Sequence, residues 1–448
     1  MKFKIWQNYI KNYREIGITK TRRLLLNTLN YALNSVDPRN YLHKIVRYRG
    51  GILAVYNSEY VVNIDNTYIF GFGKSVGYLA EALIEILGGV AGGAIIVPKE
   101  DINKYSFSEI EVYGASHPYP DVDTLKSSTK LVNYLMDTDD SAFIIFLISG
   151  GGSSLFEIPN ESISMDELVY TYKLLVNSGL SIEEINTVRS ILSKVKGGKL
   201  LRYVYPRNCI ALVISDVVGD RLDVIASAPL YNITPNYINI LPKIKSAGLL
   251  EKLPSNVIKV LAKEEYFQSY DYYVEHFIVG RNFDLLNAVK EYLVSMDINA
   301  AIMSSFIDTS VDLAVEILKP VILEEIHNNE PLRKPCILIF GGETYSKVLG
   351  DGLGGPNQEL VLKLALALNY PKNISLLAID SDGIDGNSPA AGAIADKHTF
   401  ERIAKDRLNV NQYLMESNSY TLLNSISSAI ITGSTGLNVN NLMLAVIK

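Results

Sequence analysis

Short runs of β-branched and other apolar residues alternate along the chain with stretches in which apolar residues recur every three or four positions. The first pattern predicts strands and the second predicts helices, so their alternation predicts a mixed α/β fold with parallel strands joined by helices. The predicted strands are Thr67–Phe70, Gly93–Val97, Phe143–Ile148, Cys209–Ser215, Val274–Val279, Ala300–Ser304, Cys336–Phe340, Ile374–Ile379 and Ala429–Thr432. The predicted helices are Lys74–Leu87, Thr124–Leu135, Met165–Asn177, Asn282–Val294, Val311–Ile326 and Asn357–Leu368.

The stretch Ala226–Tyr273 interrupts this alternation. It contains four prolines and ends in a polar, tyrosine-rich segment. Such a shift in composition is typical of a boundary between two domains. We therefore predict two α/β lobes, residues 1–265 and residues 266–448. Ahead of the first sheet, leucines at helical spacing predict an amphipathic helix over Ile18–Ser35.

Composition and charge narrow the class of protein. The chain has 448 residues, of which 20% are charged, and its formal net charge is −6. A mildly acidic chain does not coat nucleic acid, so any anionic ligand must be held by a local site. Cys209 and Cys336 lie in apolar runs, and no segment resembles a signal peptide or a membrane span. We expect a cytoplasmic protein without a zinc or iron site, because its histidines are not at metal-ligand spacing.

Four of the apolar runs end in turns rich in glycine. These turns are Gly71–Ser75, Ser149–Ser154, Gly341–Thr344 and Thr432–Gly436. Open parallel sheets bind ligands beyond the carboxyl ends of their strands, where such turns let a ligand approach the backbone. The four turns together predict one large binding cleft.

The first turn, taken alone, leaves its function open. A strand followed by Gly71-Phe72-Gly73 and a helix is compatible with dinucleotide binding, but Val76 stands where the usual fingerprint has its third glycine. As a phosphate-binding P-loop the turn fails, because Tyr68 occupies the position of the first glycine. A plain strand-to-helix turn with a solvated Lys74 explains the residues equally well.

The second turn is more specific. Gly150, Gly151 and Gly152 lie between Ser149 and Ser153, directly after a strongly apolar predicted strand. A flexible linker would not follow such a buried strand. The backbone N–H groups and hydroxyls of this turn suit an oxygen of a phosphate or of a carboxylate. The turn therefore predicts an anion-binding site.

Acidic residues also follow three of the predicted strands. They are Asp216, Glu343 and the pair Asp380 and Asp382. Carboxylates near glycine turns suit Mg²⁺ that bridges phosphate oxygens. The pair does not begin an EF-hand, because Ala391 stands where the closing glutamate belongs. Three further acids in these loops are interpreted as caps of helices or turns: Asp220, Asp223 and Asp385.

Basic residues gather in one segment that contains Arg189, Lys194, Lys196 and Lys199. Most of such a run is normally a solvated helix face. A chain of negative net charge that binds anions nevertheless needs cations at its site, so we expect one or two of these residues to face the cleft. His117 is the one histidine in a turn context, where it either lines the site or packs within the turn.

Nine motifs, in this order and spacing, resemble the glycerate kinases with a MOFRL-type C-terminal lobe. They are Gly71–Lys74, Ser116–Pro118, Leu147–Leu155, Asn186–Arg189, Ser215–Asp220, Gly341–Thr344, Gly354–Glu359, Asp382–Gly386 and Thr435–Val439. The resemblance implies ATP- and Mg²⁺-dependent phosphorylation of D-glycerate, with 2-phosphoglycerate as the product. It also implies two dissimilar three-layer α/β/α lobes with mainly parallel sheets, the first of them Rossmann-like, that flank a deep cleft.

The same resemblance assigns roles to residues at the strand ends. The residues expected to be catalytic are Lys74, Asp216, Glu343, Asp382 and Asn438, of which Asp216, Glu343 and Asp382 would hold Mg²⁺. The residues expected to bind substrate or nucleotide are Gly73, Ser149, Gly150, Gly151, Gly152, Ser153, Arg189, Asn282 and Asn357. The implied partners are D-glycerate and ATP, with neither nucleic acid nor a membrane, and a homodimer is left open.

One position departs from the family pattern. Where the family has an arginine after two glycines, this chain has Pro356. Either Arg281, Arg189 or Lys347 supplies the cation, or the site works without it.

Two other functions stay open at this point: an NAD(P)H-dependent hydroxypyruvate reductase, which the first glycine turn suits, and a non-catalytic sugar-acid or nucleotide-binding protein. The second is disfavoured, because a pure anion binder would not place carboxylates at its site.

Overall fold

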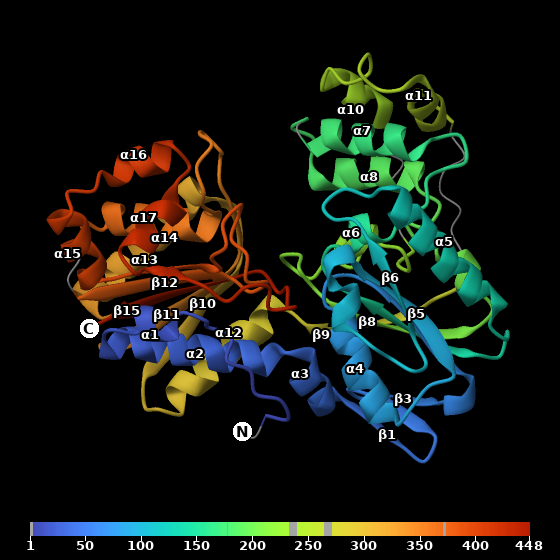
Figure 1. The fold of residues 1–448 in the computed structure, drawn as a ribbon, viewed down its shortest axis with the longest axis horizontal. Coiled ribbons are helices and arrows are strands. Elements are labelled where there is room, and N and C mark those ends of the chain that lie inside the picture. The colour runs from blue at the N-terminus through green and yellow to red at the C-terminus, as the bar shows by residue number, and fades with distance from the viewer. Residues whose placement is uncertain (1–2, 177, 233–239, 264–270, 371–372) are drawn as a thin grey trace. The chain divides into compact units, whose positions relative to one another are not determined.

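The computed structural model describes residues 3–176, 178–232, 240–263, 271–370 and 373–448. It divides into two compact units (Figure 1). The central unit is Leu42–Val279, and the terminal unit combines Met1–Tyr41 with Gly280–Lys448. This division differs from the predicted lobes, because the first 41 residues join the C-terminal unit and the second boundary follows residue 279 instead of residue 265.

The stretch predicted to be a domain boundary belongs to the central unit. Apart from residues 233–239 and 264–270, which lie outside the described part, it contains α10 (Ile240–Ser246) and α11 (Ser255–Leu261). Their apolar residues share a core with α7 (Met165–Val176) and α8 (Ile182–Leu192). The stretch therefore lacks strand alternation because it adds helices to this core. The predicted end of α7, Asn177, is also outside the described residues.

A six-stranded sheet forms the middle of the central unit, in the order β6-β5-β4-β7-β8-β9. Its strands are β4 (Thr67–Phe72), β5 (Gly92–Pro98), β6 (Glu111–Ala115), β7 (Phe143–Ile148), β8 (Asn208–Ile214) and β9 (Glu275–Gly280). The strands from β6 to β8 pair in parallel. The chain proceeds from β4 to β5 and β6 on one side and resumes at β7 on the other. Ligands of such sheets bind where the strand order reverses, which here is between β4 and β7.

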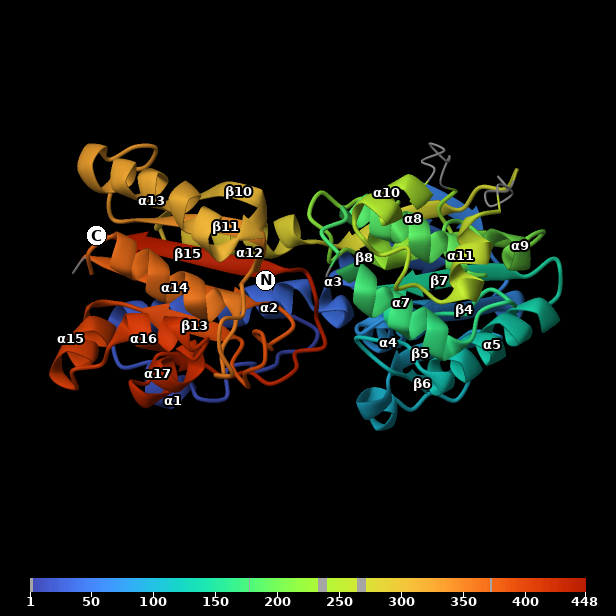
Figure 2. The ribbon, with the colours of Figure 1, turned by 90° about the horizontal axis from the view of Figure 1, so that it is seen from above.

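Helices cover both faces of this sheet (Figure 2). Phe70 and Phe146 point to a core that includes α5 (Val122–Asp137), α6 (Gly152–Leu155) and α9 (Leu201–Val204). Because side chains alternate along a strand, Ile69 and Ile145 point to the opposite face, where α4 (Val76–Leu87) contacts β4, β5 and β7. Every residue of β7 is buried, as expected for a parallel strand covered on both sides.

The terminal unit contains a second six-stranded sheet, in the order β10-β11-β15-β12-β13-β14. Its strands are β10 (Asn299–Ser310), β11 (Cys336–Tyr345), β12 (Ile374–Asp380), β13 (Gly392–Ala395), β14 (Ala429–Ile430) and β15 (Asn441–Ile447). Four strands run in one direction, and β13 and β15 run in the other. The predicted mixed α/β class is confirmed. The sequence reasoning missed β15, which makes this sheet more mixed than expected.

Helices also lie on both faces of the second sheet. The core on one face contains residues of α13 (Val311–Asn328) and α14 (Pro356–Ala367). On the other face, α12 (Asn282–Val294) contacts β10, β11 and β15, and α2 (Lys20–Val36) packs against α12. The helix predicted ahead of the first sheet therefore covers the second sheet instead.

A buried arginine holds α2 in the terminal unit. The Arg22 side chain is fully buried, and its guanidinium donates to both carboxylate oxygens of Asp396, at 3.0 and 2.9 Å. It also donates to the carbonyl of Ser427 at 2.6 Å. Removing one partner of such a pair typically costs about 3–5 kcal/mol of stability. Hydrophobic periodicity predicts that α2 is amphipathic, whereas the contact with α12 and the Arg22–Asp396 pair show which unit it belongs to.

The remaining elements are short. In the central unit they are β1 (Val46–Arg49), β2 (Ile52–Val55) and β3 (Ser58–Val61), which form an antiparallel sheet, and the 3₁₀ turns η1 (Ile64–Asn66), η2 (Lys99–Lys104) and η3 (Ile225–Ser227). Elsewhere they are α1 (Tyr13–Ile16), α3 (Pro38–Ile45), α15 (Lys397–Lys405), α16 (Val410–Met415) and α17 (Ser419–Ser425). Within the described residues, no helix combines the length and the apolarity needed to cross a membrane.

Candidate functional site

Two loops meet where the strand order of the central unit reverses. Lys74 follows β4, and Ser149 follows the neighbouring strand β7. The N–H of Lys74 donates to the carbonyl of Gly150 at 2.9 Å, and the N–H of Ser75 donates to Ser149 Oγ at 2.9 Å. Gly73 has a φ of +139°, and a Cβ there would overlap Ser149, so this position requires glycine. The structure thus brings the first and second glycine turns together.

The second turn has backbone donors that no described residue accepts from. Among the described residues, no acceptor is found for the N–H groups of Gly150, Gly151 and Ser153. A Cβ on Gly151 would come within 3.1 Å of His117 Cδ2 and 3.2 Å of Lys74 Cγ, so both side chains lie against this turn. A lysine beside several N–H donors is an arrangement that suits an anion.

A second cation is linked to the same turn through Ser153. Its hydroxyl lies 2.9 Å from Ser227 Oγ, which donates to Asn186 Oδ1 at 3.4 Å. Arg189 Nη1 donates to the same oxygen at 3.4 Å, and the guanidinium stacks 5.3 Å from the ring centre of Tyr172. We call Arg189, Asn186, Ser153 and Ser227 the Arg189 cluster. The sequence reasoning included Asn186 in a family motif but not among the site residues, and it did not identify Ser227.

A buried ion pair supports this cluster. Lys196 and Glu157 are 1% and 0% exposed, and Lys196 Nζ lies 3.3 Å from Glu157 Oε2. Lys196 Nζ also donates to the carbonyls of Ser153 at 2.7 Å and Phe156 at 2.9 Å. The Tyr172 hydroxyl donates to Glu157 Oε2 at 2.8 Å. Lys196 is therefore not part of a solvated face; it fixes the backbone of the segment that carries Ser153.

Asp216 lies at the same edge of the central sheet. It follows β8, the strand next to β7, and is half-buried. The preceding residue, Ser215, forms a tight turn in which its hydroxyl donates to the carbonyl of Val217 at 3.2 Å. The central unit therefore places Asp216, Lys74 and the second glycine turn at the carboxyl ends of three neighbouring strands.

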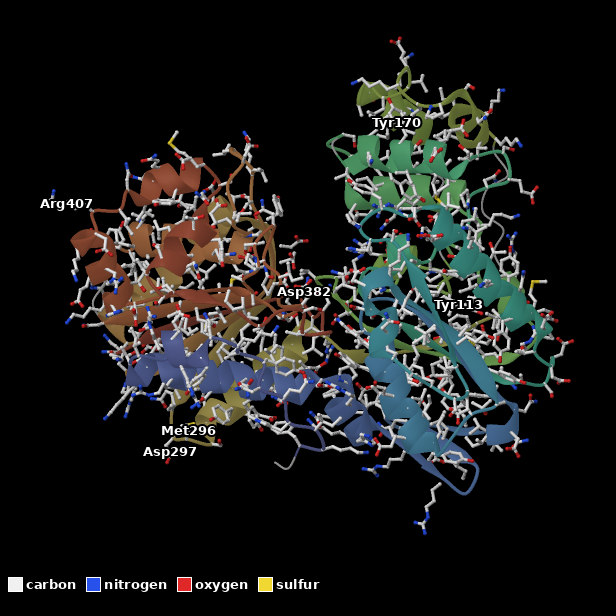
Figure 3. All side chains as sticks on the ribbon, in the orientation of Figure 1. Tyr113, Tyr170, Met296, Asp297, Asp382 and Arg407 are labelled. Atoms are coloured by element: carbon white, nitrogen blue, oxygen red, sulfur yellow. The ribbon has the colours of Figure 1, made fainter. Side chains whose placement is uncertain are left out.

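Acidic residues gather at one edge of the terminal sheet. Asn441 of β15 pairs with Asp380 of β12 on one side and with β11 on the other, so the ends of these strands are level. Glu343 lies near the end of β11, and Asp382 lies in the loop after β12, where Figure 3 labels it. The amide of Asn440 donates to Glu343 Oε2 at 2.9 Å. We call Glu343, Asp380, Asp382 and Asn440 the acidic edge.

Asp380 is the carboxyl group of this edge whose pKa is shifted by its surroundings. Burial raises its pKa well above the ordinary value, and the nearby carboxylates of Asp382 and Glu343 raise it further. Its Oδ1 accepts a hydrogen bond from the N–H of Asp382 at 2.9 Å. Strongly shifted carboxyl groups at strand ends are typical of functional sites. The sequence reasoning noted Asp380 but left it out of the predicted site, although it is the first acidic residue after β12.

The oxygen ligands at the two edges have the chemistry that Mg²⁺ prefers. Within the described residues, no group of three or more His, Cys, Asp or Glu side chains is arranged to hold a metal ion. The predicted ligands belong to different units, with Asp216 in the central unit and Glu343 and Asp382 in the terminal unit. Mg²⁺ is usually bound through one or two carboxylates together with substrate phosphates. Each unit offers one or two such carboxylates by itself, a number that suits this mode of binding.

Asp385 holds the start of α14. Its carboxylate accepts hydrogen bonds from the backbone N–H groups of Asn357 and Gln358, at 3.0 and 2.9 Å. It also accepts hydrogen bonds from their side-chain amides, at 3.1 and 2.8 Å. Burial raises the pKa of Asp385 to about 6, although these hydrogen bonds act to lower it. The predicted capping role of Asp385 is confirmed, and the Asn357 amide is engaged in it.

Two further predicted residues lie around the loop that precedes β15. The Asn282 amide donates to the carbonyls of Val439 and Asn441, at 2.8 and 2.9 Å. Asn438 lies within this loop and is half-buried. Asn282 thus fixes the backbone that presents Asn438 and Asn440.

The residue that replaces the family arginine borders a cavity. Pro356 is the first residue of α14, where its missing N–H costs nothing. The cavity measures about 400 Å³, and its lining includes Pro356, Tyr345, Val348, Glu359 and Asn418. Of the three candidate cations, Lys347 lies exposed between two lining residues, and Arg281 is 3.7 Å from Asp284. The third, Arg189, lies in the central unit.

The predicted site residues thus form two groups. Those of the central unit are Gly73, Lys74, Ser149, Gly150, Gly151, Gly152, Ser153, Arg189 and Asp216. Those of the terminal unit are Asn282, Glu343, Asn357, Asp382 and Asn438. Most members of each group follow strands of their own sheet, whereas Arg189, Asn282 and Asn357 lie on helices. Position along the sequence predicted the members at strand ends but not the contacts within each group.

Two known families match the chain. A family described as a domain of unknown function, DUF4147, matches residues 24–262, and the MOFRL family matches residues 336–441. The first match begins inside α2, so its limits differ from those of the central unit.

Several proteins and one solved structure are similar to this chain over most of its length. The D-glycerate 2-kinase of Thermotoga maritima is 35% identical over 86% of this chain and 92% of its own. The glycerate 2-kinase of Picrophilus torridus is 34% identical over 97% of this chain and 98% of its own. The crystal structure of a glycerate kinase from Thermotoga maritima matches with a TM-score of 0.82 and 32% identity, over 95% of this chain and 99% of that one. A putative hydroxypyruvate reductase of Agrobacterium vitis is 28% identical over 84% of this chain and 97% of its own.

Proposed function

The chain belongs to the MOFRL-type glycerate kinase family, and we propose that it is a D-glycerate 2-kinase. In the proposed reaction the 2-hydroxyl oxygen of D-glycerate attacks the γ-phosphorus of ATP. The bond between that phosphorus and the β,γ-bridging oxygen breaks, so the products are 2-phosphoglycerate, ADP and the hydroxyl proton.

The observation that supports this proposal best is the position of Lys74. It lies against the second glycine turn, beside backbone N–H groups that have no acceptor among the described residues. Phosphoryl transfer passes through a loose transition state, so catalysis consists mainly of positioning the reactants and neutralising charge. A lysine and several fixed N–H donors at a strand end can do both.

The remaining predicted residues take complementary roles in this proposal. Asp216 together with Glu343 or Asp382 would hold Mg²⁺, which when bound neutralises charge on the β- and γ-phosphates. The carboxylate that is not used as a ligand would orient the 2-hydroxyl group and accept its proton. Asn438 would donate a hydrogen bond to the substrates.

A pair of assays tests the proposed function against the reductase alternative. The purified chain, incubated with ATP, MgCl₂ and D-glycerate, should release one ADP for each glycerate consumed. With NADH and hydroxypyruvate, absorbance at the NADH band should stay constant. The Lys74→Ala variant, purified in the same way, controls for contaminating kinases. Oxidation of NADH without any ADP release would reverse the assignment.

A further inference from the structure

We propose that the Arg189 cluster binds the carboxylate group of the acceptor substrate, with Asn186 and Ser227 as binding residues beside Arg189 and Ser153. This inference rests on the proposed function, because it states which end of D-glycerate the cluster holds. Neither Asn186 nor Ser227 was expected in the site from the sequence.

The first observation is a pair of buried donors without acceptors. Arginine can only donate hydrogen bonds, so the atom of Asn186 that faces Arg189 must be its carbonyl oxygen. The amide nitrogen Nδ2 of Asn186 therefore points elsewhere, and it has no partner among the described residues although Asn186 is only 6% exposed. Arg189 Nε is likewise buried without a partner in the described part of the chain. Unpaired buried donors are costly, so their presence one helical turn apart indicates a ligand oxygen between them.

The second observation is an excess of positive charge. Lys196 has three acceptors around Nζ, namely the carbonyls of Ser153 and Phe156 and the Glu157 carboxylate. Burial lowers the pKa of Lys196, whereas the neighbouring Glu157 carboxylate favours its charged form. Arg189 and Lys199 also lie near these two residues, so three cationic side chains surround the single carboxylate of Glu157. An anionic group of the substrate would offset this excess of positive charge.

The third observation is the backbone around Ser227. Ala226, Ser227 and Ala228 all have φ between +50° and +60°, a region that non-glycine residues rarely occupy. Such residues persist where surrounding contacts impose them, and here Gly197 and Gly198 donate to the carbonyls of Ser227 and Ala228, at 3.0 and 2.6 Å. This conformation directs the Ser227 hydroxyl toward Ser153 and Asn186.

The site is reachable from solvent on one side. Asn186 and Ser227 are buried, but Arg189 and Ser153 are half-buried. Ser153 also belongs to the second glycine turn, where Lys74 lies. A small hydroxy acid whose carboxylate contacts Arg189 can therefore extend toward the lysine that the proposed mechanism assigns to the phosphoryl group.

Two variants and a matched control test this inference. Arg189→Gln removes the cation, and Asn186→Leu removes the unpaired donor with little change in volume. Arg202 also stacks on a tyrosine, 4.5 Å from the ring centre of Tyr203, but it is exposed, so Arg202→Gln is the control. Each of the first two variants should lower kcat/KM for D-glycerate about 10- to 100-fold, the usual effect of losing a hydrogen bond to a charged group. KM for ATP should stay unchanged.

A neutral acceptor separates carboxylate binding from a structural role. D-glyceramide keeps the hydroxyl groups but lacks the charge, so its kcat/KM should be low in the wild type and nearly unaffected by Arg189→Gln. An equal fall for both acceptors would contradict the proposal and indicate a structural residue. A rise in KM for ATP alone would assign the cluster to a nucleotide phosphate instead.

Calorimetry distinguishes failure of this inference from failure of the proposed function. If the wild type binds D-glycerate but forms no ADP, the kinase assignment fails, and the carboxylate site is then judged by the loss of D-glycerate binding in Asn186→Leu. Retained binding in that variant, or no binding by the wild type, would overturn the inference. Thermal denaturation of each variant confirms that it is folded.

Discussion

The two groups of site residues differ in the sign of their charge. The group in the central unit contains Lys74 and Arg189 beside glycine and serine residues, whereas the acidic edge of the terminal unit contains three carboxyl groups and an asparagine. Lys74 and the acidic edge lie at strand ends, where the same rule of sheet architecture locates them, whereas Arg189 lies on α8. The group in the central unit is therefore suited to anionic substrates, and the acidic edge is suited to a cation and a proton. A chain of net charge −6 thus keeps its positive field local.

The two groups also differ in what fixes them. In the central unit a buried ion pair, Lys196 with Glu157, holds the backbone of the Ser153 segment. In the terminal unit, amide side chains fix the corresponding segments. Asn282 donates a hydrogen bond to the loop before β15, and Gln358 donates one to the buried Asp385. A buried ion pair thus fixes the cationic group, whereas neutral amide donors fix the acidic one without adding a charge to it.

The largest predicted effect concerns the cationic group. Lys74→Ala should lower kcat by about two to three orders of magnitude, because it removes charge stabilisation that is needed in the transition state. The side chain is half-buried and follows β4, so the fold should persist. Steady-state kinetics and circular dichroism measure the two effects. A matched control is Lys194→Ala, which removes a lysine paired with the exposed Glu161. Near-normal kcat in Lys74→Ala would disprove its role.

The next prediction tests how the cationic group is fixed. Lys196→Met leaves Glu157 buried without its cation and should destabilise the central unit by about 3–5 kcal/mol. Lys194→Met removes an exposed ion pair and should cost at most about 1 kcal/mol. Denaturant titration followed by far-UV circular dichroism measures the free energy of unfolding of both variants.

A double replacement sharpens the same comparison. Lys196→Met combined with Glu157→Leu should recover most of the lost stability, since an apolar pair can replace a buried ion pair. It should not recover activity, because the carbonyl of Ser153 still lacks its donor. If activity returned together with stability, Lys196 would have no role in positioning the turn.

Acid–base behaviour should distinguish the two units. Burial raises the pKa of Asp385 to about 6, so its contribution to stability is present below about pH 4 and is lost as the pH rises through 6. This contribution is about 3 kcal/mol at most. Asp380 should change the stability with pH in the same direction, because its pKa is also raised. In the central unit, burial acts to raise the pKa of Asp121, but hydrogen bonds from Lys99 and Ser116 outweigh it and lower the pKa. The stability that Asp121 contributes should therefore be lost as the pH falls.

The measurement is the free energy of unfolding between pH 4 and pH 7 for the wild type and for Asp385→Asn. In the wild type, the titration of Asp385 should lower the stability between pH 4 and 6, and this decrease should be absent in the variant. The variant should also be less stable at every pH, because the amides at the start of α14 lose an acceptor. An unchanged pH dependence would show that Asp385 is ionised like an exposed carboxylate.

The smallest effect is expected at the position of the missing family arginine. Pro356 borders a cavity of about 400 Å³, and a first-turn helical position accepts most residues, so Pro356→Arg should change stability by less than about 1 kcal/mol. The added cation should lower KM for one of the two anionic substrates a few-fold. Unchanged KM values for both would show that this position does not act on the substrates.

Periodicity and turn chemistry predicted most of the fold. The strands β4, β7, β8, β11 and β12 and the glycine turns after β4 and β7 follow from apolar runs that end in glycine or acidic residues. The strand β15 was missed, because no helix follows its apolar run at the end of the chain. The sequence predicted α2 as an amphipathic helix ahead of the first sheet, and the structure packs it against α12 in the terminal unit. Amphipathic spacing indicates that one face of a helix is buried, but it does not indicate which element covers that face.

The sequence predicted where most site residues lie, but it did not predict which side chains they contact. Lys74 and Glu343 follow strands and were identified from that alone. Lys194 and Lys196 are two residues apart in an irregular segment, so no periodicity distinguishes the exposed lysine from the buried one. Asn186, Asn440 and the perturbed Asp380 depend on contacts between distant strands and helices, which a single sequence does not reveal.

The most direct test of the central proposal is the identity of the phosphorylated product. After incubation with ATP, MgCl₂ and D-glycerate, proton-coupled ³¹P NMR should show a new phosphomonoester signal split into a doublet, because the phosphorus of 2-phosphoglycerate couples to a single C–H proton. A triplet would place the phosphoryl group on the terminal CH₂–O oxygen and contradict 2-phosphorylation. The absence of any new phosphomonoester would contradict the kinase assignment itself.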